Sequence, residues 1–325
     1  MSYILPDEDF MILAESSLIR RDYLTIKERT RLDSLACGYC HKRLLNQKQR
    51  VVVAQSDYTS FNSYIPFTVT QRNGGKESKN KVVVITGGAT GIGLHIADNY
   101  LKHGAKLTIL LDINEKHGAD AVKTLTTKHG SNKAVFIKCD VTTDLDTVSK
   151  KILDTYKTVD ILVNNAGILD DQAWKKCIDI NVTYLIGWAM KFWDHMRKDN
   201  GGKGGTIVNL ASIYGYRVEP YLPVYQASKF AVLGFTRSLG HRDNYKKTGV
   251  RVVAICPGFT ETNLTVSPKT WDDVFFSVDF TKYLNAQAWQ KVEAVGKAAA
   301  DVFETAESGS AWLIEGGRPI VEVVN

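Results

Sequence analysis

The 325-residue chain lacks the features typical of secreted, membrane-spanning and nucleic-acid-binding proteins. Its five cysteines are odd in number and scattered, so we expect no disulfide framework. No apolar run approaches the roughly 18 residues that a membrane helix needs. The net charge of +6 is spread without a block of one sign, which argues against a nucleic-acid or anionic membrane partner. With acidic residues at positions 7–9, where a presequence would be basic, these absences favour a globular protein of the cytoplasm.

The chain changes character near residue 80. Residues 1–79 show no sustained period, and we interpret them as an N-terminal extension of unknown role. The extension contains a segment that resembles a metal or haem motif, with Cys37, Cys40 and His41. Zinc needs about four ligands, and no second pair follows at a useful spacing. We therefore predict ordinary cysteines and no metal site.

From residue 81 onward, short apolar runs alternate with helical stretches. Alternation of this kind predicts βαβ units and a parallel sheet. Because the runs are apolar throughout, both faces of the sheet should be covered. We predict an α/β fold, a doubly wound parallel sheet of seven strands with helices on both faces, over residues 80–325. The expected strands are 81–86, 106–112, 134–138, 161–163, 206–210, 251–256 and 310–314, and the expected helices are about 91–103, 114–129, 142–156, 173–198, 224–246 and 286–305.

A glycine-rich turn follows the first expected strand. The segment Thr86–Gly93 joins that strand to a helix, whose free N–H groups and positive dipole end suit a pyrophosphate. The second strand ends at Asp112, about twenty residues beyond the glycines, where an acid bonds the ribose hydroxyls of NAD. The same acid would repel the 2′-phosphate of NADP by about 4 kcal/mol per charge pair at about 4 Å. We therefore predict NAD; the alternative for Asp112 is a helix N-cap.

Tyr225 and Lys229 stand four residues apart, and Ser212 precedes Tyr225 by thirteen residues. On a helix, positions i and i+4 share a face, so an ammonium would lie beside a phenol. A neighbouring cation favours the phenolate and lowers the pKa of the phenol, so the side chain can act as a base nearer to neutral pH. The pattern predicts proton transfer at a substrate hydroxyl. The alternative is an ordinary helix face.

Five motifs in order give the chain a family resemblance. The turn Thr86–Gly93, the segment Asn164-Asn165-Ala166-Gly167, Asn181, the group Ser212, Tyr225 and Lys229, and Pro257-Gly258 with Thr262 resemble the short-chain dehydrogenase/reductase family with its dinucleotide-binding (Rossmann) fold. Within that family the chain is similar to NAD-dependent 15-hydroxyprostaglandin dehydrogenases and insect alcohol dehydrogenases. The segments that carry this closer similarity are 192–194, 201–205, 223–225, 234–238 and 255–259.

The resemblance implies a role for each matching residue. Tyr225 would exchange the hydroxyl proton, Lys229 would lower the pKa of Tyr225 and hold the cofactor ribose, Ser212 would orient the substrate oxygen, and Asn181 would support a proton relay. Taken singly, Asn181 could instead cap a turn, and Asp140, expected at the adenine, could start a helix. The family also implies a homodimer or homotetramer. The expected cofactor contacts are Gly87, Gly88, Thr90, Gly91, Ile92, Gly93, Asp112, Ile113, Asp140, Val141, Asn164, Asn165, Ala166, Gly167, Tyr225, Lys229, Pro257, Gly258, Thr260 and Thr262.

Residues 259–285 form the expected substrate lid. Long loops in compact domains are usually functional. The aromatic side chains of the lid suit an apolar alcohol or ketone; the alternative is that they pack against the core or a second subunit. They are Phe259, Trp271, Phe275, Phe276, Phe280 and Tyr283.

Leu222 limits the choice of substrate. It stands where hydroxyprostaglandin dehydrogenases have a glutamine that bonds the substrate, which argues against a prostaglandin. We expect Ser212, Leu222, Tyr225 and Phe259 to contact the substrate. The predicted activity is NAD-dependent oxidation of a secondary or lipid-like alcohol. The alternatives are an NADPH-linked carbonyl reductase and a non-catalytic binding protein of the same fold.

Overall fold

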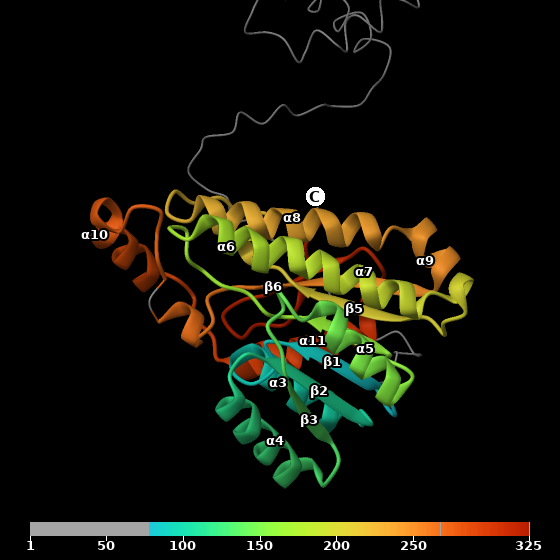
Figure 1. The fold of residues 1–325 in the computed structure, drawn as a ribbon. Helices are drawn as coiled ribbons and strands as arrows, with labels where there is room; N and C mark the ends of the chain where they lie inside the picture. The colour runs from blue at the N-terminus through green and yellow to red at the C-terminus, as the bar shows by residue number, and fades with distance from the viewer. Residues whose placement is uncertain (1–77, 267, 325) are drawn as a thin grey trace, which may run out of the picture. The chain divides into compact units, whose positions relative to one another are not determined.

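The computed structural model describes residues 78–266 and 268–324 (Figure 1). The N-terminal extension expected over residues 1–79, with its Cys37, Cys40 and His41, therefore lies almost wholly outside the described residues. In the described part, no helix combines the length and the apolar character needed to cross a membrane. The same part holds no group of three or more His, Cys, Asp or Glu side chains arranged to bind a metal ion.

One sheet runs through the described residues, in the strand order β3-β2-β1-β4-β5-β6-β7-β8. Neighbouring strands from β3 to β7 pair in parallel, which confirms the doubly wound parallel sheet. The strands are β1 (Val82–Thr86), β2 (Leu107–Asp112), β3 (Ala134–Lys138), β4 (Ile161–Asn164), β5 (Gly205–Leu210), β6 (Val250–Pro257), β7 (Ala311–Ile314) and β8 (Val321–Glu322).

The sheet has one strand more than the seven predicted. β8 pairs antiparallel with β7 through only two residues. The turn before it contains Gly316 and Gly317, both at positive φ, a conformation that glycine adopts without steric cost. A two-residue strand at the edge of a sheet carries no apolar run, so the sequence pattern gave no sign of it.

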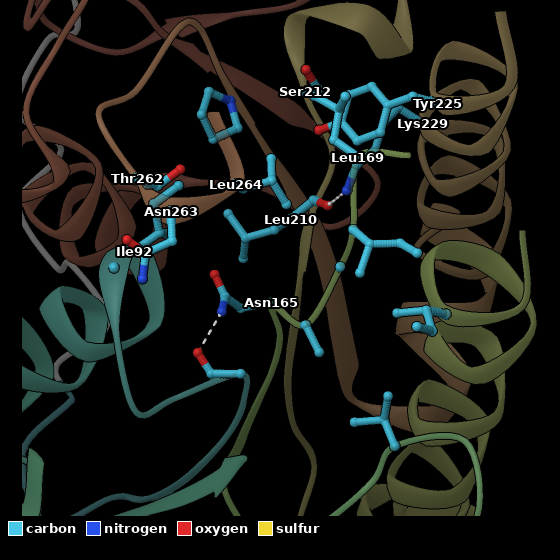
Figure 2. Close-up of a pocket in the computed structure, with 18 of the residues that line it drawn as sticks. Ile92, Asn165, Leu169, Leu210, Ser212, Tyr225, Lys229, Thr262, Asn263 and Leu264 are labelled. Atoms are coloured by element: carbon cyan, nitrogen blue, oxygen red, sulfur yellow. Dashed lines mark hydrogen bonds between the residues drawn. The ribbon is translucent and has the colours of Figure 1, made fainter. Parts of the chain in front are cut away.

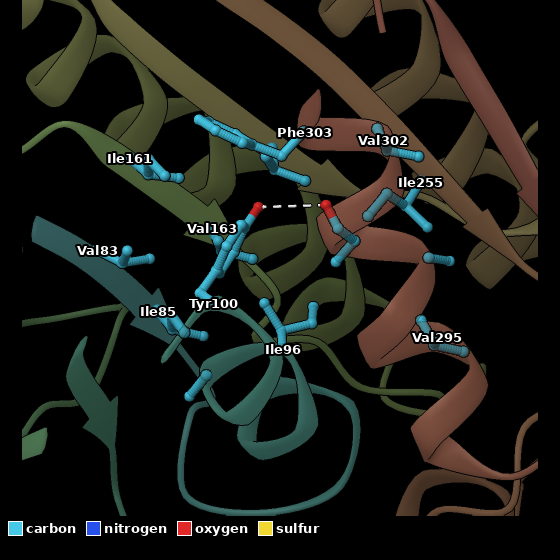
Figure 3. Close-up of a cluster of buried hydrophobic side chains, with 14 of the residues drawn as sticks. Val83, Ile85, Ile96, Tyr100, Ile161, Val163, Ile255, Val295, Val302 and Phe303 are labelled. Carbon is cyan, nitrogen blue, oxygen red and sulfur yellow. Dashed lines mark hydrogen bonds between the residues drawn. The ribbon is translucent and has the colours of Figure 1, made fainter. Parts of the chain in front are cut away.

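Helices cover both faces of the sheet, and the strand residues alternate between the two faces. In β1, Val83 and Ile85 belong to the core cluster with α3 and α11, while Val84 belongs to the cluster with α5 and α7. Figure 3 shows the first cluster, where the rings of Tyr100 and Phe303 meet edge to face with centroids 5.7 Å apart. The helices are α3 (Gly91–Lys102), α4 (Glu115–His129), α5 (Leu145–Tyr156), α6 (Trp174–Ile178), α7 (Leu185–Met196), α8 (Pro223–Leu239), α9 (Arg242–Thr248), α10 (Asp273–Asn285) and α11 (Val292–Thr305).

Two of the expected long helices are interrupted. The helix expected over 173–198 contains a π-helical turn, Asp179–Tyr184, between α6 and α7. The helix expected over 224–246 breaks at Gly240, between α8 and α9. A Cβ on Gly240 would lie 2.5 Å from the amide nitrogen of Gly309, so the chain passes too close here for any other residue. The helix expected from residue 286 begins later, at Val292.

Candidate active site

A cavity of about 1010 Å³ opens at the carboxyl ends of β1, β2, β4, β5 and β6. The strand order reverses between β1 and β4, the place where open α/β sheets bind their ligands. Figure 2 shows that the cavity wall brings together segments far apart in the sequence, from Ile92 on α3 to Tyr225 on α8 and Thr262 after β6.

The glycine-rich turn forms one end of the cavity. Gly87 and Gly91 adopt φ values of +61° and +53°, which favour glycine. A Cβ on Gly93 would lie 2.3 Å from the carbonyl oxygen of Gly87, so this position also needs glycine. α3 begins at Gly91, and its N-cap residue Thr90 makes no side-chain cap. The turn and the first amides of α3 therefore suit a pyrophosphate.

Asn165 holds the glycine-rich turn against the loop that follows β4. Its Nδ2 donates to the carbonyl oxygens of Thr86 and Gly87 at 3.0 and 2.9 Å. The Thr86 hydroxyl accepts from the amides of Asn165 and Ala166 at 3.0 and 3.1 Å. The two loops are thus fixed to each other on the floor of the cavity.

Asp112 ends β2 and lines the end of the cavity next to that strand. Its carboxylate accepts from the amides of Ala89 and Asn114 at 3.2 and 3.1 Å. The N-cap of α4 is Asn114, whose side chain accepts from the amide of His117, so the N-cap alternative for Asp112 is wrong. Ile113 beside it is 66% exposed and lines the cavity.

Asp140 lies at the same end of the cavity. Its carboxylate accepts from the amide and the hydroxyl of Thr142 at 2.9 and 2.6 Å, and these hydrogen bonds hold the pKa of Asp140 below its usual value. α5 begins only at Leu145, after Asp144, so Asp140 does not start the helix.

α8 places Tyr225 and Lys229 on the opposite wall, and both side chains are buried. The Nζ of Lys229 lies 5.5 Å from the ring centroid of Tyr225 and donates to the carbonyl oxygen of Leu210 at 2.8 Å (Figure 2). Burial lowers the pKa of Lys229 to about 8. Burial also raises the pKa of Tyr225, and a hydrogen bond with Ser212 opposes that rise. Phenol, hydroxyl and amine therefore meet in one buried site.

Asn181 lies in the π-helical turn and is fully buried. Its Oδ1 accepts from the amide of Ile168 at 2.9 Å, and its Nδ2 donates to the Ile168 carbonyl at 2.9 Å and to the Ser228 hydroxyl at 3.1 Å. The side chain thus links the loop after β4 to α8, next to Lys229. π-helical turns are frequent at functional sites.

The aromatic residues of the expected lid fall into three groups. Phe259 lines the cavity. Phe276, Phe280 and Tyr283 pack around Tyr221, with ring centroids 5.1 to 5.3 Å from its ring. The other two, Trp271 and Phe275, are exposed. All six rings therefore contact other aromatic rings, as the packing alternative expects, and Phe259 alone of the six also lines the cavity.

Most of the expected site residues line the cavity, but five do not. Gly88 packs on Leu110 of β2, and Leu222 is buried in the aromatic cluster rather than in the cavity wall. Gly88 and Leu222 thus pack behind the cavity wall, and Asn181 is linked by hydrogen bonds to Ile168, which lines the cavity. The expected residues that do not line the cavity are Gly88, Gly93, Asn164, Asn181 and Leu222.

Several apolar residues of the wall were not predicted. Ile168, Leu169, Tyr214 and Leu264 face the same space as Ser212 and Phe259. Tyr214 follows Ser212 by two residues and Ile168 follows the Asn164–Gly167 segment directly, so position along the chain was an available signal for both. These residues give the cavity an apolar stretch of wall.

Comparison with known proteins identifies the family. The model of the short chain dehydrogenase family matches residues 81–273. Rat 15-hydroxyprostaglandin dehydrogenase [NAD(+)] is 37% identical over 208 residues, which cover 63% of this chain and 78% of the relative. Alcohol dehydrogenase 1 of Ceratitis cosyra is 34% identical over 240 residues, 73% of this chain and 92% of the relative.

Solved structures share the fold. Levodione reductase superposes with a TM-score of 0.62 at 22% identity, covering 74% of this chain and 97% of its own. A variant of actinorhodin polyketide ketoreductase with NADPH gives a TM-score of 0.63 at 25% identity, covering 75% and 98%. The family model, the relatives and the fold agree, and the chain belongs to the short-chain dehydrogenase family of oxidoreductases.

Proposed function

We propose that this protein oxidises an apolar secondary or lipid-like alcohol to the carbonyl compound with NAD, and that Tyr225 is the general base. One observation carries the proposal: Tyr225, Ser212 and Lys229 line the same cavity as the glycine-rich turn and Asp112. Substrate and cofactor would therefore meet there.

Each side chain has a definite part in the reaction. Ser212 would hold the alcohol oxygen by a hydrogen bond, and Tyr225 would take the hydroxyl proton. Lys229, whose ammonium lies beside the phenol ring, would stabilise the phenolate. Asn181 would keep the segment after β4 and α8 in register around this centre. When bound, the nicotinamide supplies the hydride acceptor.

Asp112 supports NAD as the cofactor. Its carboxylate stands at the end of β2, where the adenosine ribose would lie, and it would repel a 2′-phosphate. The relatives with NAD(+) in their names agree with this choice. The ketoreductase structure contains NADPH, so the alternative to be tested is an NADPH-linked carbonyl reductase. Comparing kcat/KM for NAD with kcat/KM for NADP decides between them, and a preference for NADP would overturn the proposal.

The apolar wall supports an apolar substrate. Ile168, Leu169, Tyr214 and Phe259 line the cavity. A screen of isoprenoid, steroid, prostanoid and short-chain alcohols with NAD should give the highest kcat/KM for a bulky apolar secondary alcohol. Binding of NAD without turnover of any alcohol would favour a non-catalytic binding protein instead.

We further propose that residues 80–325 are the catalytic domain of a cytoplasmic homodimer or homotetramer. A chain truncated to begin at Lys79 should then keep its turnover, and light scattering should report two or four copies. Loss of turnover on truncation would assign the extension a part in catalysis.

A further inference from the structure

The helix that carries Tyr225 begins without a cap of its own. α8 starts at Pro223, which has no N–H group, and its N-cap residue Leu222 makes no side-chain hydrogen bond. The Leu222 carbonyl accepts the first helical bond, from the amide of Gln226 at 2.9 Å. The amides of Val224 and Tyr225 precede that bond, so they need acceptors from elsewhere in the chain.

Asp171 supplies both acceptors from 54 residues before Tyr225. Its Oδ2 accepts from the amide of Val224 at 2.7 Å, and its Oδ1 accepts from the amide of Tyr225 at 2.9 Å. The side chain is buried, with 4% of its surface exposed. A buried carboxylate costs free energy unless it is well bonded, and here the positive end of α8 stabilises it. The Asp171 carboxylate thus binds the backbone amides at the start of α8, including that of Tyr225.

The segment that ends at Asp171 also touches the other parts of the site. Asn165 and Ala166 line the cavity beside the glycine-rich turn. Ile168 is bonded through both its amide and its carbonyl to Asn181. Asp171 therefore fixes α8 to the same stretch of chain that fixes the cofactor end. The hydrogen bonds of Asp171 to α8 thereby fix the position of Tyr225 relative to the cofactor end of the cavity.

A second buried carboxylate, Glu219, has a different task. It accepts from the amides of Tyr221 and Leu222 at 2.8 and 2.9 Å and from the side chain of Gln226 at 2.7 Å. Glu219 therefore holds the loop before α8. Of the two acids, Asp171 is the one that bonds the backbone of Tyr225 itself.

We propose that Asp171 is the positioning residue of Tyr225: by capping the first turn of α8, it holds the phenol against Ser212 and the substrate oxygen. This assignment rests on the proposed role of Tyr225 as the base. Displacement of a reacting group by about 1 Å can cost on the order of a hundredfold in rate, so loss of the cap should act mainly on the chemical step.

The test uses the full chain with substitutions at two adjacent acids. Asp171→Ala removes both acceptors, and Asp171→Asn keeps the shape and one acceptor. Asp170→Asn is the matched control, since its carboxylate accepts from the amide of Ala173 at 3.1 Å and lies 3.6 Å from Lys269, without bonding α8. Tyr225→Phe is the reference for loss of the base. The readouts are kcat, KM for NAD, the NADH dissociation constant and the deuterium isotope effect with alcohol labelled at the carbinol carbon.

The expected result is a split between chemistry and cofactor binding. In Asp171→Asn, kcat falls about tenfold to a hundredfold and the isotope effect rises, while KM for NAD and NADH affinity stay within about twofold. Asp171→Ala loses more, and Asp170→Asn keeps the wild-type kcat. If Asp171→Ala does not fold, Asp171→Asn decides alone.

Three results would overturn the assignment. A wild-type kcat and isotope effect in Asp171→Asn, with Tyr225→Phe inactive, would refute the role of Asp171 alone. Loss of NADH binding in parallel with kcat would reduce Asp171 to a general structural role. Full turnover in Tyr225→Phe would remove the proposed base, and the positioning role with it.

Discussion

Burial shifts the proton affinities of two neighbouring side chains, Tyr225 and Lys229, against their charged forms. It raises the pKa of the phenol and lowers that of the amine to about 8. The sequence predicted the pair from its spacing alone. It could not predict how deeply the two side chains are buried, because residues distant in the chain cover them.

The pair predicts how the reaction depends on pH. Below about pH 8 both groups hold their protons, so no acceptor is available for the alcohol proton. Above that pH the Lys229 amine is neutral, so it can take up the proton that Tyr225 receives from the alcohol. The kcat/KM for alcohol oxidation should therefore rise through about pH 8, and that for carbonyl reduction should fall. Rates measured in both directions check this, and an oxidation rate that falls as the pH rises through 8 would contradict it.

Asp112 predicts the choice of cofactor at the same scale. Asp112→Asn removes the charge and keeps the shape, so the ratio of kcat/KM with NADP to that with NAD should rise at least tenfold, and at most on the order of a thousandfold. Asp140→Asn is the control, since the adenine contact expected of Asp140 would affect both cofactors alike. An unchanged ratio in Asp112→Asn would show that this carboxylate does not select the cofactor.

At the scale of elements, most of the site was predictable because each motif falls at the end of a strand or the start of a helix. The glycine-rich turn follows β1, Asp112 ends β2 and Ser212 follows β5. What the sequence did not reveal depends on contacts across the fold. The cap on α8 comes from Asp171, and the π-helical turn around Asn181 has no breaker residue to mark it.

The turn between β1 and α3 yields a prediction at this scale. In Gly93→Ala, the new Cβ would lie 2.3 Å from the Gly87 carbonyl and 2.7 Å from the Asn165 amide, so the turn must open. We expect NADH affinity to fall at least about tenfold and Tm to drop by several degrees. Fluorescence titration and thermal unfolding measure both. Lys102→Ala, on an exposed position in the last turn of α3, should change neither. Unchanged NADH affinity in Gly93→Ala would argue that the pyrophosphate binds elsewhere.

At the scale of the whole molecule, the parallel sheet explains why the site is where it is. Seven strands were predictable because a strand covered on both faces is apolar throughout, without alternating polar residues. The two core clusters lie on the two faces of the sheet and show this covering. Parallel strands bring their carboxyl ends to one edge, so residues of four of the five motifs, spread over residues 86–262, line one cavity, and the fifth, Asn181, is bonded to the cavity residue Ile168. The substrate was less predictable, since Phe259 alone of the six lid aromatics lines that cavity.

The central claim is that this convergence makes Tyr225 the base of an NAD-dependent alcohol dehydrogenase. The most direct test is the rate of NADH formation from NAD and an apolar secondary alcohol by the wild-type chain and by Tyr225→Phe, with NADH binding measured in both. The account predicts equal NADH binding and a rate lower by about a hundredfold to ten-thousandfold in Tyr225→Phe. Equal rates in the two proteins would contradict it.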